Sequence, residues 1–238
     1  MLSAENLILS VPGKVLYSGL SLSVHPGECW AILGCNGSGK TTLLHALSGL
    51  APPLGGNVAL DEKNFAGYPR RELARAIGVL LQDEAQGFWG TVLEYALLGR
   101  YPHGDEDGGA ALAALRRSGM EAFAPRRLAT LSGGERQRVR IAQLLAQAPR
   151  LYCLDEPLQH LDLRHQAGMM ALFRELAQED GSAVVMVLHE PWWAVRYCSH
   201  ALLLFGDGQT LGGAVQTVLN GENLEKLYGC PTIDPICV

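Results

Sequence analysis

A run near the N-terminus combines glycines, a lysine and hydroxyl residues at the spacing of a phosphate-binding loop. Gly34-Cys35-Asn36-Gly37-Ser38-Gly39-Lys40-Thr41 fits the pattern G-x-x-x-x-G-K-[ST] at every fixed position, and Thr42 follows it. Glycines let such a loop wrap closely around a ligand, so that backbone N–H groups point at phosphate oxygens. We expect this run and Thr42 to bind phosphates, with Lys40 reaching the β- and γ-phosphates and the Thr41 hydroxyl helping to hold Mg²⁺.

A pair of carboxylates later in the chain offers the complementary chemistry. The run Leu151-Tyr152-Cys153-Leu154-Asp155-Glu156 predicts a short apolar strand that ends in two acidic residues. Strand ends of this kind face the ligand crevice of an open α/β sheet. Acidic residues often merely solvate a strand end. Combined with a phosphate loop, however, the pair predicts that Asp155 holds Mg²⁺ through its water shell and that Glu156 orients and polarises the attacking water.

These residues need a sheet to bring them together, and the apolar pattern predicts one. The expected strands are Leu7–Leu9, Leu20–Val24, Glu28–Leu33, Asn57–Leu60, Ile77–Leu81, Leu151–Leu154, Ala183–Leu188 and Ala201–Phe205. The expected helices are Lys40 to about Leu50, Arg71–Ala76, Thr91–Leu98, Ala110–Arg117, Glu135–Gln147, Leu163–Gln178 and Pro191–Tyr197. Strands that alternate with helices indicate an α/β fold with a largely parallel sheet.

One stretch breaks that alternation. Between residues 83 and 130 the expected helices are separated by clusters of Gly, Asp and Pro, so we interpret the stretch as a helical insert. The chain is then a single domain whose core comprises residues 1–82 and 131–238. Apolar residues at helical spacing also predict one buried face on the helix Leu163–Gln178. That face comprises Leu163, Ala167, Met170, Phe173 and Ala177.

Composition limits the class of protein. The 238 residues are 48% hydrophobic and 18% charged, which is typical of a globular chain rather than a disordered one. The net charge of −5 argues against a surface that binds nucleic acid. No apolar run approaches the roughly 20 residues that span a bilayer, and the N-terminus shows no secretory signal. We therefore expect a cytoplasmic protein.

A third segment indicates which kind of NTPase this is. Its sequence is Leu131-Ser132-Gly133-Gly134-Glu135-Arg136-Gln137-Arg138. It is a second backbone-rich loop at a helix start, where a serine and two glycines present donors to an anion. The segment resembles the LSGGQ signature of ABC ATPases, with Glu135 where glutamine is commonest. The resemblance runs from about residue 4 to residue 229. It implies a P-loop NTPase core with an antiparallel β subdomain and a helical insert, in which Ser132, Gly133 and Gly134 grip ATP held by the other protomer.

Further residues match motifs of the same family. Gln82 matches the Q-loop glutamine, which contacts Mg²⁺ and water, and Asp162 matches the D-loop aspartate of the nucleotide-binding set. His189 matches the switch histidine, which contacts the γ-phosphate. The resemblance therefore implies ATP and Mg²⁺ as cofactors. The implied catalytic residues are Glu156, His189 and Gln82, and the implied Mg²⁺ ligands are Thr41, Gln82 and Asp155.

The chain departs from the family pattern at two places. Val11 stands where an aromatic residue commonly stacks on adenine, and Tyr17 lies too far along the chain for a simple match. Stacking of a base on an aromatic ring contributes about 1–3 kcal/mol. We therefore expect weak ATP affinity and poor discrimination against GTP. The pair Leu158-Gln159 also replaces the usual Thr-Ser pair, which alters the detail of the D-loop.

One phosphate loop and one signature make half of a catalytic unit. The resemblance therefore implies a head-to-tail dimer with a second copy of the chain. It also implies a stand-alone ATPase subunit that lies peripherally at the cytoplasmic face of the inner membrane. The implied partners there are multi-span permease subunits and, through them, a substrate-binding protein.

Parts of the chain resemble importers of iron–siderophores, haem and cobalamin. These parts are Thr91–His103, His160–Gln166 and Val218–Gly229. In this interpretation Phe88, Trp89 and the helix Thr91–Leu98 help to form the groove that receives a cytoplasmic helix of the permease, although the aromatic pair fits the core of the insert equally well. The alternative function is a soluble ABC ATPase without a permease, such as one that serves iron–sulfur cluster assembly.

Overall fold

The computed structural model describes residues 1–82 and 87–229. The first residues of the expected insert, 83–86, and the expected end of the core, 230–238, lie outside the described residues. None of the helices in the described ranges combines the length and the apolar character needed to cross a bilayer.

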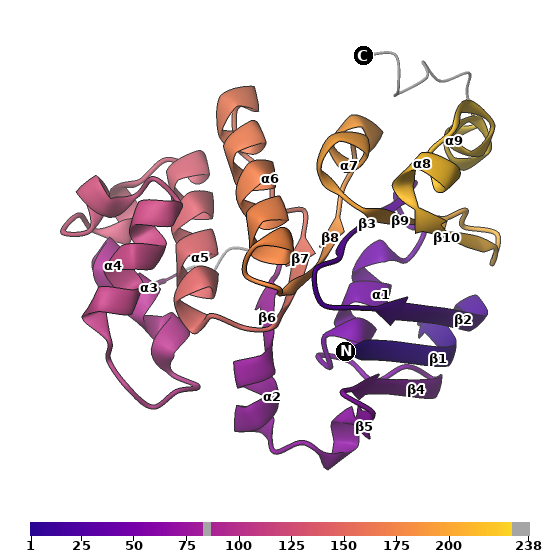
Figure 1. The fold of residues 1–238 in the computed structure, drawn as a ribbon, viewed down its shortest axis with the longest axis horizontal. Helices are drawn as coiled ribbons and strands as arrows, with labels where there is room; N and C mark the ends of the chain where they lie inside the picture. The colour runs from indigo at the N-terminus through magenta and orange to yellow at the C-terminus, as the bar shows by residue number, and fades with distance from the viewer. Residues whose placement is uncertain (83–86, 230–238) are drawn as a thin grey trace.

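A mixed sheet carries helices on both of its faces (Figure 1). In spatial order, its described strands are β10 (Thr210–Ala214), β9 (His200–Leu204), β3 (Cys29–Gly34), β8 (Ala183–Val187), β7 (Leu151–Asp155) and β6 (Ile77–Leu80). Every neighbouring pair from β9 to β6 is parallel, whereas β10 pairs with β9 in the antiparallel direction. The expectation of a largely parallel sheet is confirmed.

Alternate side chains of this sheet belong to two different cores. Along β3, Ala31 and Leu33 belong to the core that helices α5 (Gly133–Gln147) and α6 (Leu163–Gln178) complete. Trp30 and Ile32 belong to the core on the opposite face. Because both faces are covered, strands β3, β7 and β8 are buried along their whole length.

A second, antiparallel sheet closes the opposite core. Its described strands, in order, are β2 (Lys14–Val24), β1 (Leu2–Val11), β4 (Gly55–Leu60) and β5 (Lys63–Asn64). Helix α1 (Lys40–Leu47) packs between the two sheets, where Leu43, Leu44 and Leu47 are fully buried. This packing fixes the start of α1 and therefore the loop that precedes it.

Helices form a layer beside the sheet (Figure 1). Helix α3 (Val92–Leu97), the turn η2 (Leu98–Arg100) and α4 (Gly108–Arg117) pack against α5. Gly99 permits the close approach of η2, because a Cβ atom there would clash with the carbonyl oxygen of Gln143 in α5. The remaining elements are η1 (Phe65–Gly67), α2 (Arg70–Ala76), η3 (Glu121–Phe123), η4 (Leu128–Thr130), α7 (Pro191–Tyr197), α8 (Val215–Val218) and α9 (Gly221–Tyr228).

The structure corrects the sequence expectations at several places. Helix α1 ends at Leu47 rather than near Leu50, because Gly49 turns the chain with a φ of 74°. In α6, Met170, Phe173 and Ala177 are buried as expected, but Leu163 is 70% exposed because it opens the first turn, beyond the core. Strands β5 and β10 escaped prediction because most of their residues are exposed or half-buried and give no apolar signal.

Candidate functional site

The phosphate loop connects the buried strand β3 to helix α1. Gly37 and Gly39 adopt φ angles of 78° and 93°, a left-handed conformation that glycine accepts without strain. Gly34 must also lack a side chain, because a Cβ atom there would crowd the carbonyl oxygen of Leu204. The backbone path of the loop thus depends on the glycines that the sequence pattern singled out.

Lys40 is buried at the start of α1. Its Nζ atom donates to the carbonyl oxygen of Gly34 at 2.8 Å and to that of Cys35 at 3.2 Å. Burial lowers the pKa of Lys40, and the nearby charge of Glu156 opposes that shift. The ammonium group is therefore held over the loop, where an anionic ligand would meet it.

A tyrosine that no motif identified holds the loop from within the core. The hydroxyl of Tyr17 donates to the carbonyl oxygen of Ser38 at 2.7 Å and accepts from the N–H of Gly206 at 3.2 Å. Burial raises the pKa of Tyr17. Its ring is fully buried, so it is not placed to stack on a base. An isolated tyrosine in a strand carries no sequence signal for such a contact.

Asp155 at the end of β7 is a buried carboxylate suited to a metal ion. The residue is 1% exposed, and neither carboxylate oxygen accepts a well-aligned hydrogen bond from the described residues. Burial raises the pKa of Asp155, and the nearby Thr41 hydroxyl opposes that shift. A buried carboxylate that lacks well-aligned hydrogen bonds is costly, and oxygen is the ligand that Mg²⁺ prefers. Asp155 and Thr41 therefore fit the ion that the sequence implied.

Glu156 lies at the meeting point of neighbouring strand ends. Its Oε1 atom is 2.8 Å from Nε2 of His189, which follows β8. Its Oε2 atom accepts a hydrogen bond from Nε2 of Gln82, which follows β6, at 3.3 Å. Glu156 itself has a left-handed φ of 48°, a conformation that persists in a non-glycine residue only where its surroundings fix it. The structure thus brings together the residues expected to be catalytic.

Gln159 makes a further contact with Glu156 that sequence reasoning did not assign. Its Nε2 atom donates to Oε2 of Glu156 across the turn that follows β7. Gln159 occupies one of the positions where the chain departs from the usual Thr-Ser pair. That departure was the available signal, since a glutamine side chain is long enough to reach back to the carboxylate and a serine is not.

A cavity of about 610 Å³ opens over these residues, within the size range of small-molecule sites. It is lined by Asn36, Gly37 and Gly39 of the loop, by Lys40, Thr41 and Thr42 in the first turn of α1, and by Gln82, Glu156 and His189. Val11 and Leu16 give it an aliphatic wall, and none of its described lining residues is a phenylalanine, tyrosine or tryptophan. The expectation of weak ATP affinity and poor base discrimination stays a prediction.

The signature residues and Asp162 lie in a different cavity. This second cavity, of about 530 Å³, is lined by Ser132, Gly133, Gly134, Glu135, Arg138, His160, Leu161, Asp162 and His165. Asp162 caps α6, and the hydrogen bond from the N–H of His165 lowers the pKa of Asp162. Within a single chain, the phosphate-loop residues and the signature residues with Asp162 therefore lie in separate cavities.

Glu135, which departs from the commonest signature sequence, has a structural role at the start of α5. Its Oε2 atom accepts from the N–H of Ser132 at 2.7 Å, while Oγ of Ser132 accepts from the N–H of Glu135 at 3.3 Å. This reciprocal cap lowers the pKa of Glu135. Glutamate and glutamine both supply the required acceptor, so the substitution preserves the cap.

The comparisons with known proteins agree with this geometry. Residues 17–159 match the family model described as "ABC transporter". The chain is 37% identical to the ferric enterobactin transport ATP-binding protein FepC of Escherichia coli (strain K12), with 98% of this chain and 89% of FepC covered. It is 39% identical to the hemin import ATP-binding protein HmuV of Gloeobacter violaceus, with 98% and 89% covered.

Solved structures show the same fold. An inward-facing metal-chelate type ABC transporter aligns with a TM-score of 0.84 and 32% identity, over 97% of this chain and 89% of the other. A dimeric ATP-binding cassette in a post-hydrolysis state, bound to ADP and Pi, aligns with a TM-score of 0.80 and 28% identity, over 90% and 99%.

The mixed sheet, the phosphate loop and the strand-end carboxylates define a P-loop NTPase. The chain belongs to the ABC transporter family, and it is an ATP-hydrolysing subunit of an importer in that family. The alternative of a soluble ATPase in iron–sulfur cluster assembly is not favoured, because these relatives, which match nearly the whole chain, are named for ferric enterobactin transport and hemin import.

The exchange Tyr17→Phe tests the anchoring of the phosphate loop, because it removes the hydroxyl and keeps the ring. We expect the free energy of unfolding to fall by about 1–3 kcal/mol, since the N–H of Gly206 loses its acceptor. Urea denaturation followed by circular dichroism measures the change. The matched control is Tyr101→Phe, whose side chain is exposed. Equal stability of the two variants would contradict the anchoring.

The exchange Asp155→Asn tests the cost of the buried carboxylate. Because burial raises the pKa of Asp155, the ionised form destabilises the folded chain at neutral pH, and an amide removes that cost. We expect the melting temperature of the nucleotide-free protein to rise by about 2–4 °C while ATP hydrolysis is lost. The difference should vanish as the pH falls and the wild-type carboxyl becomes protonated. A lower melting temperature at neutral pH argues against this account.

Proposed function

We propose that the cavity of about 610 Å³ beside the phosphate loop, the phosphate cavity, binds ATP with Mg²⁺, and that hydrolysis of this ATP drives the import of a metal chelate. The observation that carries the proposal is the placement of Glu156. Its carboxylate lies in the cavity wall beside the phosphate loop, with Gln82 and His189 in contact with its two oxygens. A carboxylate held in this way is able to orient a water molecule toward the terminal phosphate.

The residues of the phosphate cavity have different roles in this proposal. The backbone N–H groups of residues 34–39, together with Lys40, bind the phosphates. Thr41, Asp155 and Gln82 would hold Mg²⁺, which supplies charge neutralisation on the phosphate oxygens when it is bound. Glu156 accepts a hydrogen bond from the attacking water, and His189 contacts the γ-phosphate.

We propose that a second copy of the chain completes the site. Ser132, Gly133, Gly134 and Asp162 lie in a cavity of their own rather than beside the phosphate loop. In a head-to-tail dimer with two-fold symmetry, each of these cavities would face the phosphate cavity of the partner. The dimeric relative bound to ADP and Pi supports this arrangement.

We propose an iron–siderophore, haem, cobalamin or similar metal chelate as the cargo. Relatives named for ferric enterobactin transport and for hemin import support this class, as does the metal-chelate type transporter of matching fold. The chain would then lie peripherally at the cytoplasmic face of the inner membrane and bind multi-span permease subunits. A substrate-binding protein would act on it only through the permease.

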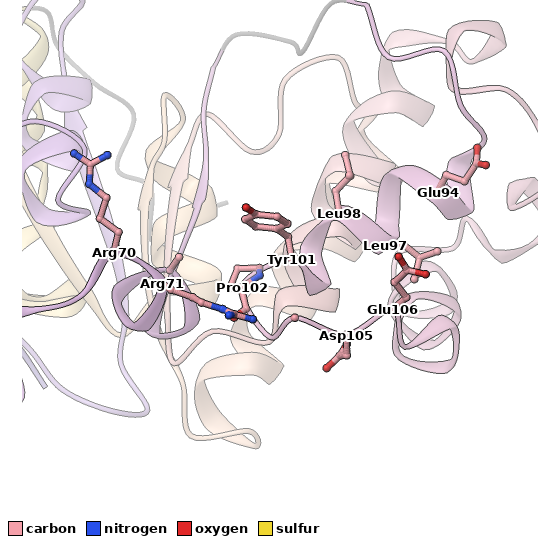
Figure 2. Close-up of a pocket in the computed structure, with 11 residues that line it drawn as sticks. Arg70, Arg71, Glu94, Leu97, Leu98, Tyr101, Pro102, Asp105 and Glu106 are labelled. Atoms are coloured by element: carbon pink, nitrogen blue, oxygen red, sulfur yellow. The ribbon is translucent and has the colours of Figure 1, made fainter.

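A groove of about 890 Å³ is our candidate for the permease contact. Figure 2 shows Arg70 and Arg71 on one side of the groove, Leu98 and Glu94 on the other, and the ring of Tyr101 between them. The side chain of Tyr101 is 84% exposed. A large exposed apolar surface with charged residues at its rim is typical of a protein interaction site.

The groove uses the expected helix but not the expected aromatic pair. Phe88 packs edge-on against Tyr95, with ring centroids 5.2 Å apart, and is partly buried. Trp89 is 84% exposed, yet it does not line the groove. We propose that residues 83–130 form an insert whose helix α3 carries one wall of the groove, so that movement of the insert is transmitted to the permease.

The exchange Glu156→Gln tests the hydrolytic assignment. A neutral amide cannot take up a proton from the attacking water, so we expect hydrolysis to fall by about 10²-fold or more, in line with the contribution of a general base. Nucleotide binding should persist, and the variant should accumulate as an ATP-bound dimer in size-exclusion chromatography. Hydrolysis at the wild-type rate would show that Glu156 does not orient the water.

The double exchange of Leu98→Ala and Tyr101→Ala tests the groove. We expect transport by the reconstituted complex to fall at least tenfold while the ATPase activity of the isolated subunit is unchanged, because both side chains lie outside the phosphate cavity. Leu54→Ala is a control that removes an exposed leucine away from the groove. Normal transport by the double variant would rule the groove out as the permease contact.

A further inference from the structure

A buried arginine connects the two segments that carry Gln82 and Glu156. Arg140 on α5 is 9% exposed, and its Nη2 atom donates to the carbonyl oxygen of Leu81, the residue before Gln82. Its Nη1 atom donates to Oε1 of Gln137 at 2.9 Å. The guanidinium group thus holds a backbone carbonyl and a side-chain amide at the same time.

Gln137 extends this connection to the catalytic carboxylate. The residue is 3% exposed, and its Nε2 atom donates to the carbonyl oxygen of Pro157 at 3.0 Å. Pro157 directly follows Glu156 in the chain. Since Nε2 of Gln82 also donates to Oε2 of Glu156 at 3.3 Å, the contacts close into a ring that runs through α5, the end of β6 and the end of β7.

Packing alone does not explain this closed set of hydrogen bonds. The other buried positions in the middle of α5 are mostly apolar, among them Val139, Ile141 and Leu144. Replacement of a buried charged group by an apolar residue of similar volume is often neutral or stabilising. Stability alone therefore gives little reason for an arginine at position 140. The guanidinium instead supplies donors in a fixed planar geometry, which is suited to holding two acceptors at a set separation.

We propose that Arg140 is a positioning residue for ATP hydrolysis. Through Leu81 and Gln137 it sets the separation between the amide of Gln82 and the carboxylate of Glu156. It also ties both residues to α5, the helix that begins at the signature residue Gly133. This inference rests on the proposed role of Glu156. A small displacement of either side chain would spoil the alignment of the attacking water without affecting how the phosphate loop binds ATP.

The test compares Arg140→Met and Arg140→Lys in the full chain by steady-state ATP hydrolysis at saturating Mg²⁺. We expect kcat to fall at least tenfold in Arg140→Met, with KM for ATP within twofold of the wild-type value. Lysine keeps the charge but concentrates it in one flexible ammonium group, so Arg140→Lys should retain an intermediate kcat. A kcat of wild-type size in folded Arg140→Lys overturns the proposal, as does a change confined to KM.

A double-mutant cycle with Gln82→Ala separates positioning from a general loss of structure. If Arg140 acts through Gln82, then Arg140→Met should lower kcat by no more than about twofold in the Gln82→Ala background, because coupled residues are not additive. The same tenfold fall in both backgrounds overturns the proposal. Melting curves give the folded fraction for each variant. If Arg140→Met does not fold, the double-mutant cycle is measured with Arg140→Lys instead.

Two further variants complete the design. Arg150→Met is the control, because Arg150 is an exposed arginine just beyond α5 that pairs with Asp61 at 2.8 Å, and its kcat should equal that of the wild type. Glu156→Gln in the same assay separates the two proposals. Wild-type hydrolysis by Glu156→Gln overturns the proposed function. Loss of hydrolysis by Glu156→Gln together with normal kcat in both Arg140 variants overturns only the positioning role.

Discussion

The parallel pairing of β3, β8, β7 and β6 is the constraint on which the site depends. Strands that run in the same direction end at the same edge of a sheet, so the segments that follow them meet there. Lys40 follows the loop after β3, and Glu156 follows Asp155 at the end of β7. His189 and Gln82 lie just beyond the ends of β8 and β6. Residues distant in sequence therefore share one cavity because of strand direction and strand order.

The site holds two buried ionisable groups, Lys40 and Asp155, before any ligand binds. Burial lowers the pKa of Lys40 and raises that of Asp155, because a charge is costly to hold away from water. Nucleotide phosphates with a divalent cation would supply the missing opposite charges. The apolar cores on both faces of the sheet offset this cost, so stability from elsewhere in the fold maintains groups that are placed for binding.

Helix α5 connects regions that do different things. Its first residue, Gly133, lines the second cavity together with the other signature residues. Its middle carries Gln137 and Arg140, and its outer surface packs against α3 and α4. A rigid helix is a means of transmitting displacement from a partner surface to a reaction site. The proposed permease groove, the proposed dimer contact and the proposed catalytic carboxylate of Glu156 are all linked through elements packed on this one helix.

The sequence by itself determined the chemistry and the α/β class. The phosphate loop and the strand-end carboxylates were identified because their residue types lie at short, fixed spacings beside apolar runs, and Gln82 and His189 because they match motifs of the ABC ATPase family. Tertiary structure decided the roles of Tyr17, Gln137 and Arg140, whose partners lie 21, 20 and 59 residues away for the contacts with Ser38, Pro157 and Leu81. It also exposed Leu163, at the N-terminal end of a helix whose periodicity predicted burial. The local pattern of apolar residues predicts whether an element is a helix or a strand. Burial and long-range hydrogen bonds depend instead on where that element lies relative to its neighbours in the folded chain.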